Sequence, residues 1–325
     1  MVVEREGLGY CRGMAEESAE ARERISSGAA TLAGVGSIVL WCWSGVCYAV
    51  GSRAMGAMPY LSLACAVGVA TIAITRALRG ESVASLVRVP AHVMVAGFFG
   101  VAVYSVMLGW AMGTADESDL GQIMLLNYLW PIWIVLLGMV MVRDGRDGSP
   151  GAGWMVGLGA LMGFGGIVVA RGMGAFSHRP ASYLPHALAM VGGFLWALYS
   201  VLLRRWRVPT EKGGSTFHFI VCAVLAGTIG AMQGAWKSPG SMDAWSAMWV
   251  LFGGIGPVGL GYYWWEIAIK RGAVHLVTLL AYFIPIGSAV LIGLFFKEAM
   301  SRWLIVGAMM IAAGAWVGHR AASEG

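Results

Sequence analysis

Ten apolar runs, each about twenty residues long, constrain this chain more than any other feature of its sequence. They lie near 31–51, 60–79, 91–112, 121–142, 152–170, 184–204, 217–236, 247–268, 273–296 and 302–319. A helix of about 20 apolar residues is long enough to cross the hydrocarbon core of a bilayer. Only 12% of the 325 residues are charged, whereas soluble domains carry about 25%. The sequence therefore predicts an all-α integral membrane protein with ten transmembrane helices.

The lysines and arginines are unevenly distributed between these runs. If the N-terminus is placed on side A, sixteen of the 22 fall on side A and six on the other side. Because cytoplasmic loops are enriched in Lys and Arg, both termini are predicted to be cytoplasmic, in a bacterial inner membrane. Residues 1–30 lack the apolar stretch of a signal peptide and are predicted to be a cytoplasmic tail. This topology accounts for the net charge of +5, and we expect no nucleic-acid partner.

The second half of the chain repeats the first. CAVGVATI at 65–72 recurs as CAVLAGTI at 222–229, and MLLNYLWPI at 124–132 recurs as TLLAYFIPI at 278–286. Short apolar matches arise by chance, but several pairs in the same order at nearly one shift do not.

Each half of the repeat holds five helices, in residues 31–171 and 184–320. Five is an odd number, so the second half must enter the membrane from the opposite side. Inverted repeats of this kind are typical of secondary transporters, whose substrate site lies near the midplane between the repeats.

Asn127, the only asparagine of the chain, lies in the middle of the fourth run in the sequence NYLWP. Pro131 has no N–H, so the carbonyl group of Asn127 loses its donor four residues on. Pro285 has the same effect at the equivalent point of the second half. Freed carbonyl groups and the Asn127 amide can accept hydrogen bonds from a substrate ammonium group, so the paired breaks predict a cavity. The alternative, that both prolines only shape helix packing, stays open.

Other polar and aromatic residues in the runs complete the candidate site. On a regular helix Tyr128 and Trp130 point about 200° apart. The helical wheel therefore directs Asn127 and Trp130 into the cavity and Tyr128 toward a neighbouring helix, unless the kink reorients it. The predicted substrate-binding residues are Ser44, Tyr48, Tyr104, Asn127, Tyr128, Trp130, Pro131, Trp196, Tyr199, Trp264, Tyr282 and Pro285.

Three motifs give the chain a family resemblance. NYLWP at 127–131, FLWALY at 194–199 and AYFIPI at 281–286 together resemble the YddG-type aromatic amino acid exporters of the drug/metabolite transporter superfamily, which is of the EamA type. The resemblance covers about 31–320. The eighth run, with YYWWE at 262–266, is bulkier and more acidic than the family pattern.

The resemblance implies a ten-helix basket of two inverted halves that exports aromatic amino acids and related small metabolites. It also implies that Tyr128, Trp130 and Trp196 line the central cavity, which for Tyr128 differs from the helical wheel. The implied partners are the small-molecule substrate and the lipid bilayer. A monomer is compatible with the sequence, which leaves the oligomeric state open.

Glu266 supports a competing interpretation. Aromatic rings also hold quaternary ammonium groups, by an attraction worth about 0.5–2 kcal/mol, and Glu266 could supply a charge. A multidrug transporter for aromatic or quaternary cations is therefore the alternative. Glu266 has Lys270 four residues on, and an ion pair between the two is the predicted arrangement.

No motif of an enzyme was found. GIGPVG at 254–259 matches a dinucleotide-binding pattern, but it lacks the flanking strand and is predicted to be a helix contact or kink. We expect neither enzymatic activity nor a cofactor or bound metal. The mid-span polar groups are Asn, Ser, Tyr and Trp, none of which titrates near neutral pH. Facilitated diffusion by alternating access is therefore predicted, since Glu266, His186, His218 and His275 lie toward the ends of the runs.

Overall fold

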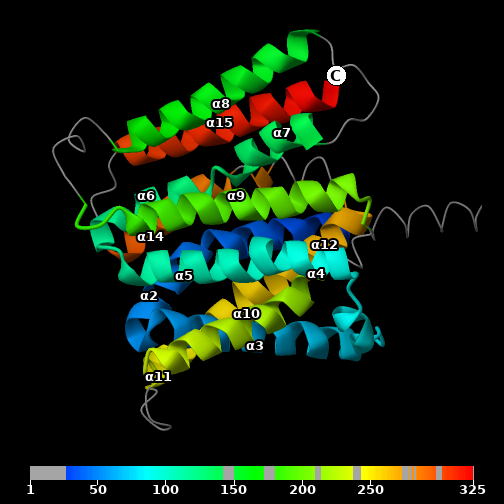
Figure 1. Ribbon diagram of the computed structural model, residues 1–325, viewed down its shortest axis with the longest axis vertical. Helices are drawn as coiled ribbons and strands as arrows, with labels where there is room; N and C mark the ends of the chain where they lie inside the picture. The colour runs from blue at the N-terminus through cyan, green and yellow to red at the C-terminus, as the bar shows by residue number, and fades with distance from the viewer. Residues whose placement is uncertain are drawn as a thin grey trace, which may run out of the picture.

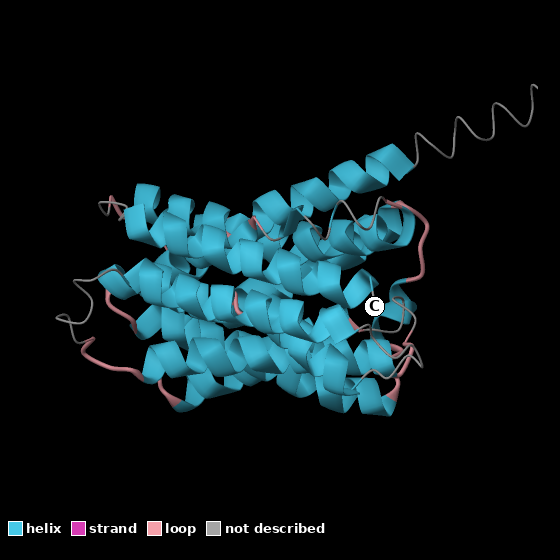
Figure 2. Ribbon diagram, turned by 90° about the horizontal axis from the view of Figure 1, so that it is seen from above, coloured by secondary structure: helices cyan, strands magenta, loops and turns pink. Residues whose placement is uncertain are grey.

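The computed structural model describes residues 27–141, 150–171, 180–208, 214–236, 243–272, 277, 280–281, 283–297 and 302–324. Within these ranges the protein consists of helices and connecting loops, with no strand (Figures 1 and 2). After a first helix, Ser27–Cys42, the α-helices are α2 (Ser44–Met55), α3 (Ala57–Leu78), α4 (Ala91–Gly97), α5 (Tyr104–Thr114), α6 (Leu120–Asn127), α7 (Trp130–Met141), α8 (Pro150–Arg171), α9 (Leu184–Arg205), α10 (Ser215–Met232), α11 (Ala244–Gly253), α12 (Gly261–Arg271), α14 (Ile284–Phe295) and α15 (Arg302–Glu324).

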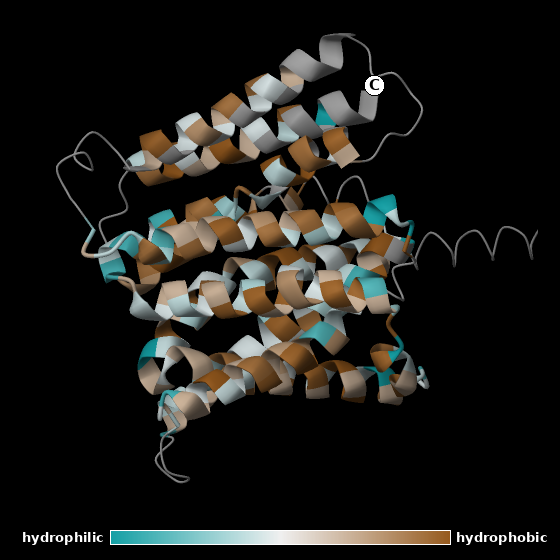
Figure 3. Ribbon diagram, viewed as in Figure 1, coloured by the Kyte–Doolittle hydropathy of each residue, from teal (hydrophilic) through white to brown (hydrophobic). Residues whose placement is uncertain are grey.

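Six helical stretches of the described chain are long and apolar enough to cross a membrane, by length and composition. They are Ala57–Leu78, Ala91–Thr114, Glu117–Gly138, Leu184–Arg205, Ser215–Met232 and Ala244–Ile269. A seventh results if the bent pair Ser27–Cys42 and α2 is one span. Three shorter apolar helices, Gly157–Ala170, Ile284–Phe295 and Trp303–Gly314, fall below this length. In Figure 3 apolar residues run along the helices, while hydrophilic residues gather near the two ends of the bundle.

Several of these stretches are not regular helices. The first helix and α2 meet at Trp43 with a bend of 41°. A π-helical segment, Phe98–Val103, joins α4 to α5, and a second one, Gly254–Leu260, joins α11 to α12. π-helical turns are rare and often occur at functional sites. At Trp43 and at Phe98–Val103 the apolar runs predict continuous helices, so hydropathy alone does not reveal these two irregularities.

The second π-helical segment contains the GIGPVG motif, and the structure confirms the prediction of a helix contact. This segment packs against α3. Gly254 lies against Val67 of α3, and Gly259 lies against Thr71. The glycines allow the two backbones to approach closely, as small residues do between membrane helices.

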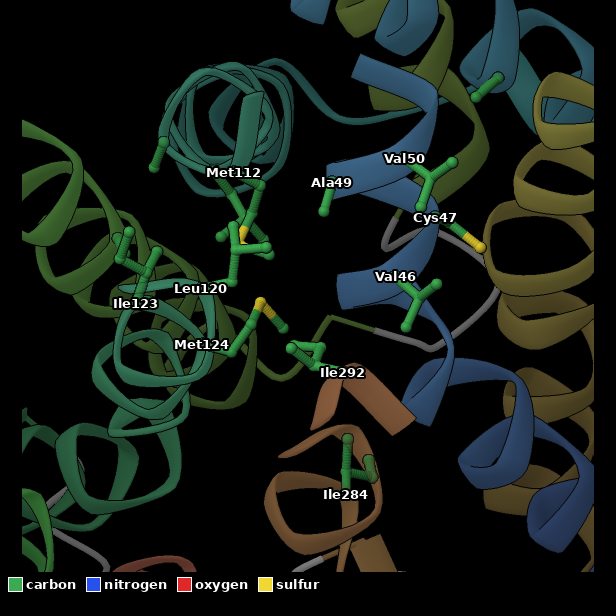
Figure 4. Close-up of a cluster of buried hydrophobic side chains, with 14 of the residues drawn as sticks. Val46, Cys47, Ala49, Val50, Met112, Leu120, Ile123, Met124, Ile284 and Ile292 are labelled. Atoms are coloured by element: carbon green, nitrogen blue, oxygen red, sulfur yellow. The ribbon is translucent and has the colours of Figure 1, made fainter. Parts of the chain in front are cut away.

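The largest buried cluster surrounds α2. Its side chains Val46 and Ala49 face Met112 of α5 and residues Leu120 and Met124 (Figure 4). Ile284 and Ile292 of α14 close the cluster on another side. The cluster therefore joins helices of the first half of the chain to α14 of the second half.

Helices α8 and α15 lie side by side at one edge of the bundle (Figure 1). A Cβ atom placed on Gly166 of α8 would lie 2.6 Å from the carbonyl oxygen of Gly307 in α15. In the opposite direction, the carbonyl oxygen of Gly166 lies still closer to the Cβ position of Gly307. These are backbone contacts that a flexible side chain cannot relieve, so the pair of helices depends on both glycines.

We expect Gly166→Val to separate α8 from α15 and to lower the free energy of unfolding by about 1–3 kcal/mol, the usual cost of overpacking. Gly157→Val is the matched control, because Gly157 is on the same helix and no atom lies within 4 Å of its Cβ position. The measurement is the melting temperature of the purified protein in detergent. Equal melting temperatures for the two variants would contradict the account of this contact.

Candidate functional site

A cavity of about 360 Å³ lies inside the helix bundle. Its walls come from both halves of the chain: the first helix, α2, α5, α6 and α7 contribute from one half, and α9, α10, α12 and α14 from the other. The described residues that line it are aromatic, aliphatic, hydroxylic or amide side chains, and none of them carries a formal charge. Such a cavity suits a flat apolar group with a few polar atoms.

The break between α6 and α7 forms one wall of the cavity. The α6 helix ends at Asn127, Tyr128 and Leu129 form a turn, and α7 begins at Trp130. The amide groups of Ile132 and Trp133 both donate to the carbonyl oxygen of Leu129, at 3.0 and 3.1 Å. Pro131 is thus the second residue of a new helix. A proline is tolerated there, because an N–H group at the second position of a helix would have no acceptor four residues back.

This turn corrects the prediction for Tyr128. Asn127, Tyr128 and Trp130 all line the cavity. The helical wheel assumes 100° per residue throughout, and that spacing does not hold across the two-residue turn. The prediction allowed for a kink that reorients Tyr128, and the structure contains such a kink.

Asn127 lies between Tyr104 and α9. Its side chain is 2% exposed, and its Nδ2 atom donates to the hydroxyl oxygen of Tyr104 at 3.4 Å, a long hydrogen bond. Its Oδ1 atom is buried and has no hydrogen-bond partner among the described residues. Its main-chain carbonyl oxygen lies against α9, where it would be 2.5 Å from a Cβ atom on Gly193. Only glycine fits at position 193, because any other side chain would displace this carbonyl group.

A network of aromatic rings surrounds the opposite wall. Trp41 contacts the rings of Tyr262 and Trp265, with centroids 5.2 and 5.1 Å apart, and its Nε1 atom donates to the carbonyl oxygen of Pro257 at 3.1 Å. Trp196 contacts Tyr262 at 6.3 Å. These separations lie in the range of favourable edge-to-face and tilted ring pairs. The rings are therefore held in place by one another and by the π-helical segment that contains Pro257.

Comparison with known proteins identifies the family. Residues 184–317 match the EamA-like transporter family. A protein of Ancylobacter novellus named "Aromatic amino acid exporter YddG" is 33% identical over 300 residues, which are 90% of this chain and 98% of that protein. The chain belongs to the YddG-type, EamA-like transporters. It is therefore a multi-pass membrane protein of a transporter family.

Further relatives of the YddG-type family agree with this assignment. Proteins with the same name from Salmonella typhimurium and Escherichia coli K12 are 25% and 23% identical, over 91% and 72% of this chain and 99% and 80% of their own lengths. A solved crystal structure is 29% identical and superposes with a TM-score of 0.64, covering 89% of this chain and 97% of that one.

In this YddG-type chain the structure brings together seven of the predicted site residues. Those lining the cavity are Ser44, Tyr48, Tyr104, Asn127, Tyr128, Trp130 and Trp196. Tyr199 lies behind the cavity wall, where its ring contacts Trp196 at 5.9 Å. Pro285 is buried in the first turn of α14, beside the cavity-lining Ile284. Tyr282 and the side chain of Pro131 lie outside the described part of the structure.

Trp264 does not line the cavity, and its neighbour Trp265 does. Trp264 packs against Gly36 of the first helix on another face of α12. Two further aromatic residues that the sequence analysis left out of the site, Trp41 and Tyr262, also line it. Helical periodicity could have found them, because Tyr262 and Trp265 are three residues apart and Trp41 precedes Ser44 by three.

Glu266 forms an ion pair, but with a residue that the sequence did not indicate. Its Oε2 atom accepts a hydrogen bond from Nη2 of Arg76 in α3 at 2.9 Å. The side chain of Lys270, the predicted partner, lies outside the description, as does His275. Glu266, His186 and His218 do not line the cavity. The pair of Arg76 and Glu266 ties α3 to α12 away from the candidate site.

Proposed function

We propose that the protein exports aromatic amino acids and related small metabolites across the bacterial cytoplasmic membrane by alternating access. The observation that carries this proposal is the uncharged, aromatic-lined cavity built from both halves of the chain. Flat rings of a substrate can stack on Trp130, Trp196 and Trp41, and each such contact is worth about 0.5–1.5 kcal/mol beyond area burial. The names of the relatives support the same substrate class.

We further propose ten membrane spans arranged as two inverted repeats, 31–171 and 184–320. The pattern of helix contacts supports this arrangement. Helix α9, at the start of the second half, packs against α5 and α7 of the first half, while α2 packs against α11 and α14 of the second. The equivalent helices α3 and α10 pack against each other, as do α8 and α15. When each broken span is taken as one unit, so that Ala91–Thr114 corresponds to Ala244–Ile269, exchanging the two halves maps this set of contacts onto itself, as an inverted repeat requires.

The transport cycle then moves one repeat against the other around the cavity. The distribution of Lys and Arg supports an orientation with both termini in the cytoplasm, so that the substrate is bound from the cytoplasmic side and released outside. The irregular segments at Trp43, Phe98–Val103 and Gly254–Leu260 lie within the spans. Interrupted helices that line a cavity are a common feature of transporters.

The runner-up function is a multidrug transporter for aromatic or quaternary cations. The cavity's rings favour it, because they can bind a cation by cation–π attraction. The candidate acid weakens it, because Glu266 is paired with Arg76 and does not line the cavity. A zwitterionic substrate needs no net charge in the cavity, which is what its described lining offers.

The two functions are distinguished by counterflow in proteoliposomes. We expect liposomes loaded with unlabelled L-phenylalanine to take up labelled L-phenylalanine or L-tryptophan faster than protein-free liposomes. Tetrapropylammonium, an aliphatic cation of similar size, should neither exchange nor compete. Exchange of the cation without exchange of the amino acids would reject the main function in favour of the runner-up.

Two neighbouring tryptophans provide a matched pair for this assay. Trp265→Ala should lower the exchange of L-tryptophan about two- to tenfold, because it removes one ring contact in the cavity wall. Trp264→Ala removes the same side chain from the adjacent position outside the cavity and should exchange at the wild-type rate. Both variants are compared at equal amounts of monodisperse inserted protein. An equal loss in both would show that the effect arises from folding and not from the site.

Energy coupling gives a separate prediction. No carboxylate or histidine lines the cavity in the part of the chain that the structure describes, so we propose facilitated diffusion down the gradient of the substrate. Preloaded proteoliposomes should release labelled L-phenylalanine at the same rate with and without an imposed pH gradient. Accumulation driven by protons, and abolished by Glu266→Gln or His275→Ala, would identify that residue as a coupling site and reject this proposal.

A further inference from the structure

Oδ1 of Asn127 is a buried acceptor that no described residue satisfies. Among the described residues that line the cavity, Oδ1 of Asn127 is the one buried side-chain atom without a hydrogen-bond partner. A buried oxygen without a partner is unfavourable. A donor that enters the cavity can satisfy it. Asn127 therefore favours a ligand that carries a donor.

The main-chain carbonyl group of Asn127 is less suited to this role. Pro131 removes its helical donor, but the oxygen lies against Gly193 of α9. A carbonyl oxygen in this position contacts the Cα–H group of glycine, an interaction that is weak but favourable. The side-chain oxygen is consequently the atom at this position that can turn toward the cavity, since a single long hydrogen bond to Tyr104 holds the amide.

Other polar groups of the cavity already form hydrogen bonds within the protein. The hydroxyl groups of Ser44 and Ser200 donate to the main-chain carbonyl oxygens of Trp41 and Trp196, at 2.6 and 2.8 Å, and their oxygens keep the ability to accept. The hydroxyl oxygen of Tyr104 accepts from Asn127. Oδ1 of Asn127 differs from these groups because it is buried and has no partner among the described residues.

We propose that Oδ1 of Asn127 accepts a hydrogen bond from the protonated amino group of the substrate and selects solutes that carry an ammonium N–H beside an aromatic ring. This inference rests on the proposed function and names the substrate group that the site recognises. A hydrogen bond to a charged group is stronger than one between neutral groups. Binding by cation–π attraction alone predicts the opposite selection, because a fully methylated ammonium group still binds aromatic rings.

Two analogues of nearly equal size separate these modes of binding. N,N-Dimethyl-L-phenylalanine keeps one ammonium N–H, and N,N,N-trimethyl-L-phenylalanine has none. We expect the wild-type protein to bind the trimethyl compound about tenfold or more weakly than the dimethyl compound, as the loss of a charged hydrogen bond requires. The measurement is the dissociation constant from isothermal titration calorimetry in lipid nanodiscs.

Variants of Asn127 test whether this residue causes the difference in affinity between the dimethyl and trimethyl compounds. Asn127→Leu keeps the number and branching of the side-chain heavy atoms and has no acceptor. The ratio of the two dissociation constants should therefore fall to about one, which completes a thermodynamic cycle. Asn127→Asp keeps an acceptor oxygen and should retain a ratio of about ten or more. If Asn127→Leu does not insert as a monodisperse protein, the wild-type ratio and the Asn127→Asp ratio decide the question.

The outcomes distinguish this inference from the proposed function. A wild-type ratio near one, or tighter binding of the trimethyl compound, overturns the inference and leaves aromatic amino acid export intact. A ratio that persists in Asn127→Leu overturns the assignment to this residue. Failure of the wild-type protein to bind or exchange L-phenylalanine itself rejects the proposed function.

Discussion

The interruption of the backbone hydrogen bonds between α6 and α7 is the constraint on which the candidate site depends. A membrane helix normally satisfies every backbone group internally, because the bilayer core offers no water. Here the regular ladder ends with the N–H of Tyr128, which donates to Met124, and it restarts with the donors that reach Leu129. The cost is limited by placing Pro131 in the first turn of α7 and by seating the freed carbonyl group of Asn127 against Gly193. The same turn directs Asn127, Tyr128 and Trp130 into one cavity.

The rest of the site is fixed by contacts that cross between the halves of the chain. Trp41 of the first helix is held by Tyr262 and by the carbonyl group of Pro257 in the second half. Tyr104 of the first half contacts Trp196 of the second at 5.9 Å. Rings from both halves therefore meet in the lining of the cavity. In the proposed cycle, a movement of one half against the other would change the cavity and so couple it to substrate binding.

The sequence was informative wherever a single residue is chemically distinctive. Asn127, Trp130 and Trp196 were found because a polar group or a large ring stands in the middle of an apolar run, and all three line the cavity. Family membership followed from the motifs around them. Six of the ten predicted runs coincide with helical stretches long and apolar enough to cross a membrane, because hydropathy depends only on composition along the chain.

Features that depend on local helix geometry were beyond the sequence. Tyr128 was misdirected because the helical wheel assumes a regular helix through the turn after α6. Trp264 was chosen over Trp265 because periodicity groups Tyr262 with Trp265 but does not show which face of α12 lines the cavity. The partner of Glu266 was missed because Arg76 is 190 residues away in the chain. Contacts of that kind are determined by tertiary packing, which one sequence without relatives does not encode in a readable pattern.

The most direct test of the account is to locate a bound aromatic substrate. Crystals of the protein grown with 4-bromo-L-phenylalanine would give an anomalous signal at the bromine atom. The account predicts one peak inside the cavity, near the rings of Trp41, Trp196 and Tyr262, with the amino group toward Asn127. A fully occupied peak elsewhere, with the cavity empty of the ligand, would contradict the central claim that the broken fourth span builds the substrate site.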